Sequence, residues 1–368
     1  MKTKRLIVKT NQEKYPIFIG SGLITNLKKI IKNEKINFIK CLIIIDKNVP
    51  KKKISIIRKN LKSKKIFIHH INANEKNKNQ KTTNEILEIM LNKNFSREDI
   101  LISVGGGITG DIAGYAASLF KRGLKFINIP TTLLAQVDSS IGGKTGVNTK
   151  QGKNLIGSFY QPKLVISDTD FLNTLPKREI ICGYGEILKH SLISSKKFFL
   201  FLNKNFDNIL KIKSPYIEKT IYESCKIKRD IVEKDVKEKN LRKILNFGHT
   251  FAHAYEASLN FSKKLNHGEA VILGMNTALQ FSKLNNLLSL NEFKIITNHI
   301  KNFGLPNDIK KYFFLKDINK ILSFMMNDKK NITSKINLIL LKRIGTPLID
   351  KKFDKKKLKI FLSQELSN

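Results

Sequence analysis

The first half of the chain consists of short apolar segments separated by polar ones. Residues 4–9 and 15–19 alternate polar and apolar side chains around a turn-like stretch, which is typical of a β-hairpin. Apolar runs typical of strands buried in a parallel sheet lie at 42–45, 66–70, 101–104 and 126–129. Helix-like periodicity occurs between them at 54–61 and 86–91. This alternation, which continues to about residue 166, predicts a mostly parallel α/β domain.

The second half of the chain has longer, helical patterns. From Pro176 onward, apolar residues recur at helical spacing over 179–202, 206–233, 268–288, 291–302 and 317–327, and in a run that begins at His249. A possible hairpin follows at 336–344. A chain of 368 residues is long enough for two domains of about 100–200 residues each. We therefore expect an α/β domain over 1–172 and a mainly α-helical domain over 173–368.

A glycine-rich turn follows the apolar run at 101–104. It leads into a small-residue helix pattern with Asp111 in its first turn. Backbone N–H groups at a helix start lack partners and lie at the positive end of the helix dipole, so such a turn favours an anion. Gly105, Gly107 and Gly110 fit G-x-G-x-x-G, but this pattern alone is weak, and no carboxylate occurs about 20 residues later, where a ribose ligand is expected. A tight structural turn remains the alternative.

Two further features suggest a nucleotide site with a substrate loop attached. The run at 126–129 ends in Pro130-Thr131-Thr132, and a Gly-rich, lysine-bearing loop continues to Asn154. Asp46 ends the run at 42–45, where the carboxyl end of a parallel strand faces a ligand crevice. It either accepts a hydrogen bond from a ribose hydroxyl or serves as a loop or helix-cap carboxylate, and the sequence favours neither.

Histidines and a carboxylate in the second half predict a metal site. His249 and His253 are four residues apart, hence on one helical face, and with a carboxylate such as Glu186 they suit zinc. His267 is a rival third imidazole, and spacing does not rank the three. Lys189 follows Glu186 on the same helical face. Cations and an amide that could meet an anionic group are Lys228, Arg242 and Asn246.

Composition limits the classes of function. The formal net charge is +38, from 68 Lys and Arg against 30 Asp and Glu, which would suit a nucleic-acid-binding protein. The lysines are spread along the whole chain together with many Ile and Asn, as A/T-rich codons would give, so we favour a biased genome over a nucleic-acid footprint. Three scattered cysteines indicate neither a disulfide framework nor a thiolate zinc site. We expect a soluble protein of the reducing cytoplasm with no membrane partner, because no apolar run approaches about 18 residues.

Several uncommon strings, in order along nearly the whole chain, resemble one family. They read SVGGGITGDIAGYAAS, KRGLKFINIPTTLLAQVDSSIGGKTGVN, GKNLIGSFYQP, FLNTLPKRE, GYGEILKH, LRKILNFGHTFAHAYE and HGEAV. The chain resembles the 3-dehydroquinate synthases. This implies a Rossmann-like N-terminal nucleotide-binding domain and a mainly α-helical C-terminal metal-binding domain.

The resemblance also implies roles for individual residues. Those that match the NAD site are Asp46, Glu75, Lys78, Gly107, Ile108, Thr109, Gly110, Asp111, Thr131, Thr132, Lys144, Lys153, Phe171, Leu172, Asn173 and Thr174. The implied ligands of zinc, or of cobalt in its place, are Glu186, His249 and His267. Those that match the catalytic substrate pocket are Asp138, Lys144, Lys153, Asn154, Lys189, Lys228, Arg242, Asn246 and His253, with Lys329 or Lys330 in addition. The chain departs from the family pattern at Asn74 and Asn79, beside the NAD loop, and at Gly185, where Ala is usual.

The activity implied is conversion of 3-deoxy-D-arabino-heptulosonate 7-phosphate to 3-dehydroquinate and phosphate, in the shikimate pathway to aromatic amino acids. NAD transiently oxidises the C5 alcohol, phosphate leaves by β-elimination, the ketone is reduced again, and an intramolecular aldol closes the carbocycle. We therefore expect a cytoplasmic homodimeric lyase that takes an anionic sugar phosphate and no specific nucleic acid. The alternatives are a related sugar-phosphate cyclase, a metal-dependent polyol dehydrogenase and, outside enzymes, a basic nucleic-acid-binding protein.

Overall fold

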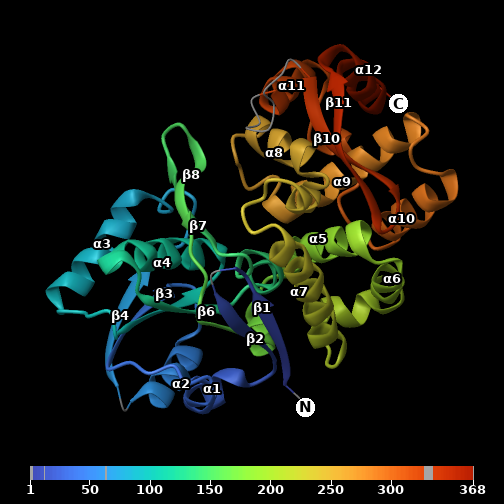
Figure 1. Ribbon diagram of the computed structural model, residues 1–368. Helices are drawn as coiled ribbons and strands as arrows, with labels where there is room; N and C mark the ends of the chain where they lie inside the picture. Colours follow the sequence, from blue (N-terminus) through green and yellow to red (C-terminus); the bar gives the residue numbers. More distant parts are fainter. Residues whose placement is uncertain (1–2, 12, 63, 327–334, 368) are drawn as a thin grey trace. The chain divides into compact units, whose positions relative to one another are not determined.

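The chain forms two compact units in a computed structural model (Figure 1), which describes residues 3–11, 13–62, 64–326 and 335–367. The first unit is Met1–Ile180 with Ile212–Lys237, and the second is Ile181–Lys211 with Glu238–Asn368. The boundary expected at 172/173 stays a prediction, although the compact units group 173–180 with the residues before them. Lys329 and Lys330 lie outside the described residues.

The first unit is built on a seven-stranded sheet. Its strands are β1 (Lys4–Lys9), β2 (Lys14–Gly20), β3 (Lys40–Asp46), β4 (Lys65–Ile71), β5 (Ile100–Gly105), β6 (Lys125–Pro130) and β9 (Leu164–Asp168). They lie in the order β1-β2-β9-β6-β5-β3-β4. Only β1 is antiparallel to its neighbour, β2, so the opening hairpin and the parallel strands agree with their predictions.

The central strands are apolar on both faces because helices cover both (Figure 1). In β3, Cys41, Ile43 and Ile45 face a core shared with α1 (Leu27–Asn33) and α2 (Lys51–Leu61). Leu42 and Ile44 face a second core shared with α3 (Gln80–Asn92) and α4 (Gly107–Leu119). Burial on both faces produces the continuous apolar runs that marked these strands in the sequence.

The lysine-bearing segment after Gly143 is a hairpin, so its description as a loop was wrong. Strands β7 (Lys144–Thr149) and β8 (Gly152–Phe159) pair antiparallel, and Figure 1 shows them as a green ribbon that extends away from the sheet. Most side chains of β8 are exposed, without the alternation of a strand that covers a core. This explains why its apolar pattern did not predict a strand.

Two predicted long helices are interrupted. The pattern at 179–202 comprises α5 (Lys177–Ser194) and the start of α6 (Lys196–Leu210), separated by Ser195, whose side chain accepts a hydrogen bond from Phe198 N and caps α6. The pattern at 206–233 is broken after α6, and α7 (Tyr216–Lys234) begins just after Pro215. Serine caps and proline are ordinary helix boundaries. Although α7 follows α6 directly, it belongs to the first unit.

The second unit is mainly helical, as predicted. Its further elements are α8 (His249–Ser258), α9 (His267–Leu284), α10 (Leu290–Asn302), α11 (Ile318–Met326), β10 (Lys335–Arg343), β11 (Thr346–Asp354) and α12 (Lys355–Ser367). A hairpin is present where one was expected, but residues 336–344 form only its first strand and the start of its turn, and the second strand is β11. The sequence analysis did not predict α12. Within the described ranges, no helix has the length and apolar character needed to cross a membrane.

A histidine is buried in the core of the second unit. His299 on α10 is 1% exposed, its Nε2 lies 2.9 Å from the Tyr184 hydroxyl, and its Nδ1 lies 2.9 Å from Asn203 Oδ1. The rings of Phe199 and Phe206 pack against it. Burial lowers the pKa of His299 from 6.5 to about 4, because the apolar surroundings disfavour the charged imidazole.

Acidification is expected to destabilise the second unit through His299. Between pH 6.5 and pH 4 the unfolded chain binds more protons than the folded chain at this position. The contribution of the neutral imidazole is therefore fully present above pH 6.5 and is lost as the pH falls toward 4. The loss amounts to about 3 kcal/mol of unfolding free energy, at about 1.4 kcal/mol for each pH unit.

Urea unfolding of the wild type and His299→Gln at about pH 7 and about pH 4.5 measures this effect. The glutamine amide does not titrate in this range, so the variant should lose less stability on acidification than the wild type. Equal losses in the two proteins would contradict the role given to His299.

Candidate functional site

The glycine turn between β5 and α4 lies close against the segment after β6. A Cβ at Gly107 would lie 2.9 Å from Ser139 Oγ, and one at Gly106 would lie 3.3 Å from Thr132 Cγ2. Thr131 N donates to Gly105 O at 2.9 Å, which fixes the two strand ends side by side. A side chain at Gly107 would therefore require Ser139 to move. The start of α4 thus lies beside the segment that carries the predicted Thr131 and Thr132, and a helix start of this kind is suited to an anion.

A buried lysine joins two other predicted site residues in the first unit. Lys78 is 5% exposed, and its Nζ donates to Asp111 Oδ2 and to Asn154 Oδ1, each at 2.5 Å. Burial raises the pKa of Asp111, although Lys78 opposes the shift. Asp111 is the fifth residue of α4, just beyond the first turn in which it was expected. The loop after β4, helix α4 and the β7–β8 hairpin thus contribute to one polar cluster.

Asp46 ends β3 as predicted, and Asn48 holds its carboxylate. The backbone N and the Nδ2 of Asn48 donate to Asp46 Oδ1 at 3.0 and 3.1 Å. Burial raises the pKa of Asp46, while these bonds lower it. The sequence analysis missed Asn48, although an Asp-x-Asn spacing after a buried strand is a usable signal because Asx side chains bond the backbone two residues on. The predicted residues Phe171 to Thr174 lie in a 3₁₀-helical segment, Thr169–Thr174, directly after β9.

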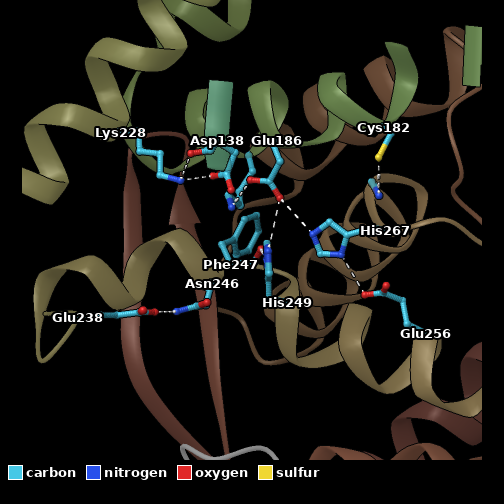
Figure 2. Close-up of polar contacts among 12 residues, drawn as sticks. Asp138, Cys182, Glu186, Lys228, Glu238, Asn246, Phe247, His249, Glu256 and His267 are labelled. Carbon is cyan, nitrogen blue, oxygen red and sulfur yellow. Dashed lines mark hydrogen bonds and ion pairs between the residues drawn. The ribbon is translucent and has the colours of Figure 1, made fainter. Parts of the chain in front are cut away.

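A second buried lysine contacts Asp138. Asp138 lies in a single π-helical turn, Ala135–Ser139, and Lys228 extends from α7. The Nζ of Lys228, a residue 5% exposed, donates to the Asp138 carbonyl and to Oδ1, each at 2.6 Å (Figure 2). Two predicted pocket residues about 90 positions apart are thereby joined within the first unit.

Glu186, His249 and His267 converge in the second unit (Figure 2). Each offers one ligand atom, and these atoms lie within 4.8 Å of one another. Nε2 of His249 is 3.4 Å from Glu186 Oε1, and Nε2 of His267 is 4.0 Å from it. His249 and His267 are the first residues of α8 and α9, whereas Glu186 lies within α5. His253 is grouped instead with Glu256 and His267.

The imidazoles are oriented as metal ligands usually are. Nδ1 of His249 lies 3.3 Å from the carbonyl oxygen of Phe247, and Nδ1 of His267 lies 3.0 Å from Glu256 Oε2. An acceptor at Nδ1 favours the tautomer that carries its proton there, which leaves the Nε2 lone pair directed at Glu186. Two imidazoles and one carboxylate with an open position are a donor set for catalytic zinc.

The charge on Glu186 is balanced by its neighbours. Glu186 is 1% exposed and forms an ion pair with Lys189 one turn later on α5. Burial by itself would raise the pKa of Glu186, but Lys189 and His249 hold it well below its usual range. Burial and Lys189 lower the pKa of His249. Paired with Lys189 and faced by the two imidazoles, the ionised Glu186 carboxylate is a ready ligand for a cation.

The buried cations distinguish the site from the rest of a lysine-rich chain. Among the described residues the buried cationic side chains other than histidine are Lys78, Lys189, Lys228 and Arg242, and each was predicted as a site residue. Two other predicted lysines are more accessible: Lys144 begins β7 and is exposed, and Lys153, with its Nζ 3.4 Å from Glu75 Oε1, is half-buried. Burial of a cation is costly unless it is compensated, and Lys78, Lys189 and Lys228 are each paired with a carboxylate.

The sequence analysis missed two carboxylates. Glu238 Oε1 accepts from Asn246 Nδ2 at 2.6 Å, and Glu256 contacts His267. Glu256 lies seven residues after His249 on the same helical face, which is a signal that spacing alone could have given. For Glu238 we find no comparable signal, because it lies outside a regular element and contacts Asn246 only through the local turn.

Known proteins match the chain over its full length. The 3-dehydroquinate synthase N-terminal model matches residues 68–182, and the 3-dehydroquinate synthase C-terminal model matches residues 183–331. A 3-dehydroquinate synthase of Pelagibacter ubique is 60% identical over 363 residues, 99% of each chain. The chain belongs to the 3-dehydroquinate synthase family. Another relative of this name, from Alkaliphilus metalliredigens, is 43% identical over 92% of each chain.

Solved structures agree with this family. The crystal structure of 2-deoxy-scyllo-inosose synthase complexed with carbaglucose-6-phosphate, NAD+ and Co2+ has a TM-score of 0.88 and 26% identity, covering 99% of this chain and 100% of that one. The predicted family and fold class of this 3-dehydroquinate synthase-like chain are therefore confirmed. The Asn79 departure is also explained: Asn79 Oδ1 accepts from Thr82 N and caps α3, as an N-cap residue should.

Replacement of Gly248 is expected to destabilise the second unit. Gly248 precedes His249 with φ of +78°, and a Cβ there would lie 2.6 Å from Met275 Cγ and 2.7 Å from Met275 N. Left-handed backbone costs an L-residue about 1–2 kcal/mol, and overpacking adds about 1–3 kcal/mol. Gly248→Ala should therefore lower the free energy of unfolding by about 2–5 kcal/mol, measured by urea unfolding.

Gly304 provides a matched control in the same unit. Its φ is +62°, and a Cβ there would meet nothing within 4 Å. Gly304→Ala should cost only the backbone term of about 1–2 kcal/mol. Equal losses in the two variants would show that the contact with Met275 does not constrain the start of α8.

Proposed function

We propose that this chain converts 3-deoxy-D-arabino-heptulosonate 7-phosphate to 3-dehydroquinate and phosphate. The family assignment supports the reaction, and a relative of this name is 60% identical over nearly the whole chain. The observation that carries the proposal is the cluster of Glu186, His249 and His267, with Lys189 buried beside it. A cluster of this kind suits a reaction on hydroxyl groups of an anionic sugar.

NAD and a divalent metal are the proposed cofactors. Two cyclases of related fold are described with NAD+ and Co2+ and with NAD+ and Zn2+. Glu186, His249 and His267 would hold the metal. The glycine turn at Gly107, with Asp46, Lys78, Asp111, Thr131 and Thr132, would hold NAD. When bound, NAD accepts and returns a hydride, while the metal acts as a Lewis acid toward the reacting hydroxyl groups.

The buried cations would bind and orient the substrate. Lys228 is fixed by Asp138, and Arg242 is 2% exposed, so both present charges whose attraction for phosphate or carboxylate is little screened by water. Guanidinium also matches the planar geometry of these groups. His253, Asn154 and Asn246 would add polar contacts. Holding one substrate through several steps accelerates them chiefly by orienting the reacting groups. The substrate's own phosphate would take the C6 proton before it leaves.

A polyol dehydrogenase is the second candidate because of the shared fold. A glycerol dehydrogenase from Schizosaccharomyces pombe has a TM-score of 0.66 at 17% identity, which supports a common fold alone. The four buried cations favour a phosphorylated, carboxylated substrate over a neutral polyol. Loss of phosphate without net formation of NADH distinguishes the two reactions.

We further propose a cytoplasmic homodimer with domains at 1–172 and 173–368. The biosynthetic reaction supports the compartment, as do three buried cysteines that form no disulfide. The change from α/β to helical texture near residue 172 supports the domains. Sedimentation of the purified chain measures the assembly state directly.

Incubation of the purified protein with the heptulosonate phosphate, catalytic NAD and zinc tests the activity. Phosphate and dehydroquinate should appear in equal amounts while total NADH stays near zero, because the hydride is returned in each cycle. Phosphate without dehydroquinate would indicate a different cyclase, and net NADH formed from a simple polyol would indicate a dehydrogenase.

Glu186→Gln tests the metal site separately from turnover. The neutral amide should lower zinc affinity by more than about 100-fold. Loss of a residue that only hydrogen-bonds a metal ligand lowers affinity about 10–100-fold, and loss of a charged ligand itself should lower it more. Zinc content after dialysis and competition with a chelator measure this loss. Glu292→Gln is the control, since Glu292 binds Lys196 and Ile344 N away from the cluster. Full zinc content in Glu186→Gln would overturn the assignment.

A further inference from the structure

Asn148 links the loop after β4 to the β7–β8 hairpin. It is the fifth residue of β7, and its backbone N donates to Lys78 O at 2.7 Å. Its Nδ2 donates to Glu75 Oε2 at 2.8 Å and to Glu75 O at 3.2 Å. Its Oδ1 accepts from the backbone N of Asn154 at 3.0 Å. One side chain thus bonds the loop through its nitrogen and the hairpin through its oxygen.

The residues that Asn148 contacts are those proposed to meet the ligands. Glu75 and Lys78 belong to the proposed NAD loop, and Asn154 to the proposed substrate pocket. Lys78 closes the arrangement, because its Nζ donates to Asn154 Oδ1. Asn154 has φ of +53°, a backbone conformation that needs local support, and its N–H is held by Asn148.

The chemistry of the two contacts selects an amide. An ionised Glu75 carboxylate only accepts, and the Asn154 N–H only donates, so a side chain that bonds both must carry one donor and one acceptor. Aspartate would keep the acceptor, lose the donor and place a negative charge 2.8 Å from Glu75 Oε2. Alanine would lose both contacts. Asparagine has the length and both functions in one planar group.

We propose that Asn148 is a positioning residue that sets Glu75 for NAD and Asn154 for the sugar phosphate. It acts through these two residues and touches neither ligand. The inference rests on the proposed function, because the roles of Glu75 and Asn154 come from it. It adds a physical link within the first unit between the cofactor loop and the substrate hairpin.

The test is a double-mutant cycle read out as the dissociation constant of NAD. Asn148→Asp should weaken NAD binding about tenfold, the scale expected for loss of a hydrogen bond to a charged group combined with repulsion. In the Glu75→Gln background, Asn148→Asp should weaken NAD binding less than about threefold. The amide introduced at position 75 can donate to the carboxylate introduced at position 148, which restores the hydrogen bond with donor and acceptor exchanged. This rescue is the distinctive result. Equal costs in both backgrounds would overturn the proposal.

Steady-state kinetics provide a second readout. Asn148→Ala should raise KM for both NAD and the sugar phosphate by about tenfold and change kcat less, because two positioned residues are released while the reacting groups remain. Thr149→Val is the matched control: among the described residues, the Thr149 hydroxyl bonds only Gly152 O and Gln151 N, within the same turn. The control should keep both KM values. If it raises them as much as Asn148→Ala does, hairpin integrity and not the link explains the effect, and the proposal fails.

The wild type separates this inference from the proposed function. If the wild-type protein does not bind NAD or release phosphate from the heptulosonate phosphate, the proposed function fails before Asn148 is considered. If the wild type does both and the Asn148 variants match it in NAD affinity and KM, only the inference fails. Thermal unfolding of each variant excludes global destabilisation, since all measurements are made well below the midpoint of the least stable protein.

Discussion

The second unit depends on the compensation of one buried carboxylate. Glu186 is almost fully removed from water, and an ionised carboxylate in such a position is unstable unless positive or donor groups surround it. Lys189 meets it from the same helix, and the imidazoles at the starts of α8 and α9 face it. Helices α5, α8 and α9 therefore have to pack so that Lys189 and the two imidazoles stay beside the Glu186 carboxylate.

The sequence predicted elements well where one local rule decided the structure. The run at 42–45 is apolar because both faces of β3 are covered. Asp46 follows where the strand ends and its side chain is only partly buried. The β7–β8 hairpin was missed because β8, with most of its side chains exposed, carries no alternation. The break after Leu210 was missed because apolar periodicity continues across it, although Pro215 marks the start of the next helix.

The candidate site was predictable to the extent that chemistry needs particular residue types. Lysine is common throughout this chain, so charge alone could not give Lys78, Lys189 and Lys228 their roles. The resemblance assigned those roles, and burial now distinguishes these lysines physically. Spacing could not rank His253 against His267; the resemblance implied His267, and α9 brings His267 to Glu186 from a distant part of the sequence. Glu238 and Asn148 contact other site side chains from a loop and a hairpin, where sequence periodicity carries little information; Glu256 could have been found by its helical spacing from His249.

The return of α7 to the first unit has a consequence for synthesis. The chain passes between the two units at three points, near residues 180, 211 and 237, so no single cut separates them. Helix α7 also meets the outer edge of the sheet, where Glu233 accepts from the backbone N of Lys9 at 2.6 Å. A ribosome must therefore deliver residues from both units before either is finished. A single junction between the units would therefore separate α7 from the sheet edge that it contacts.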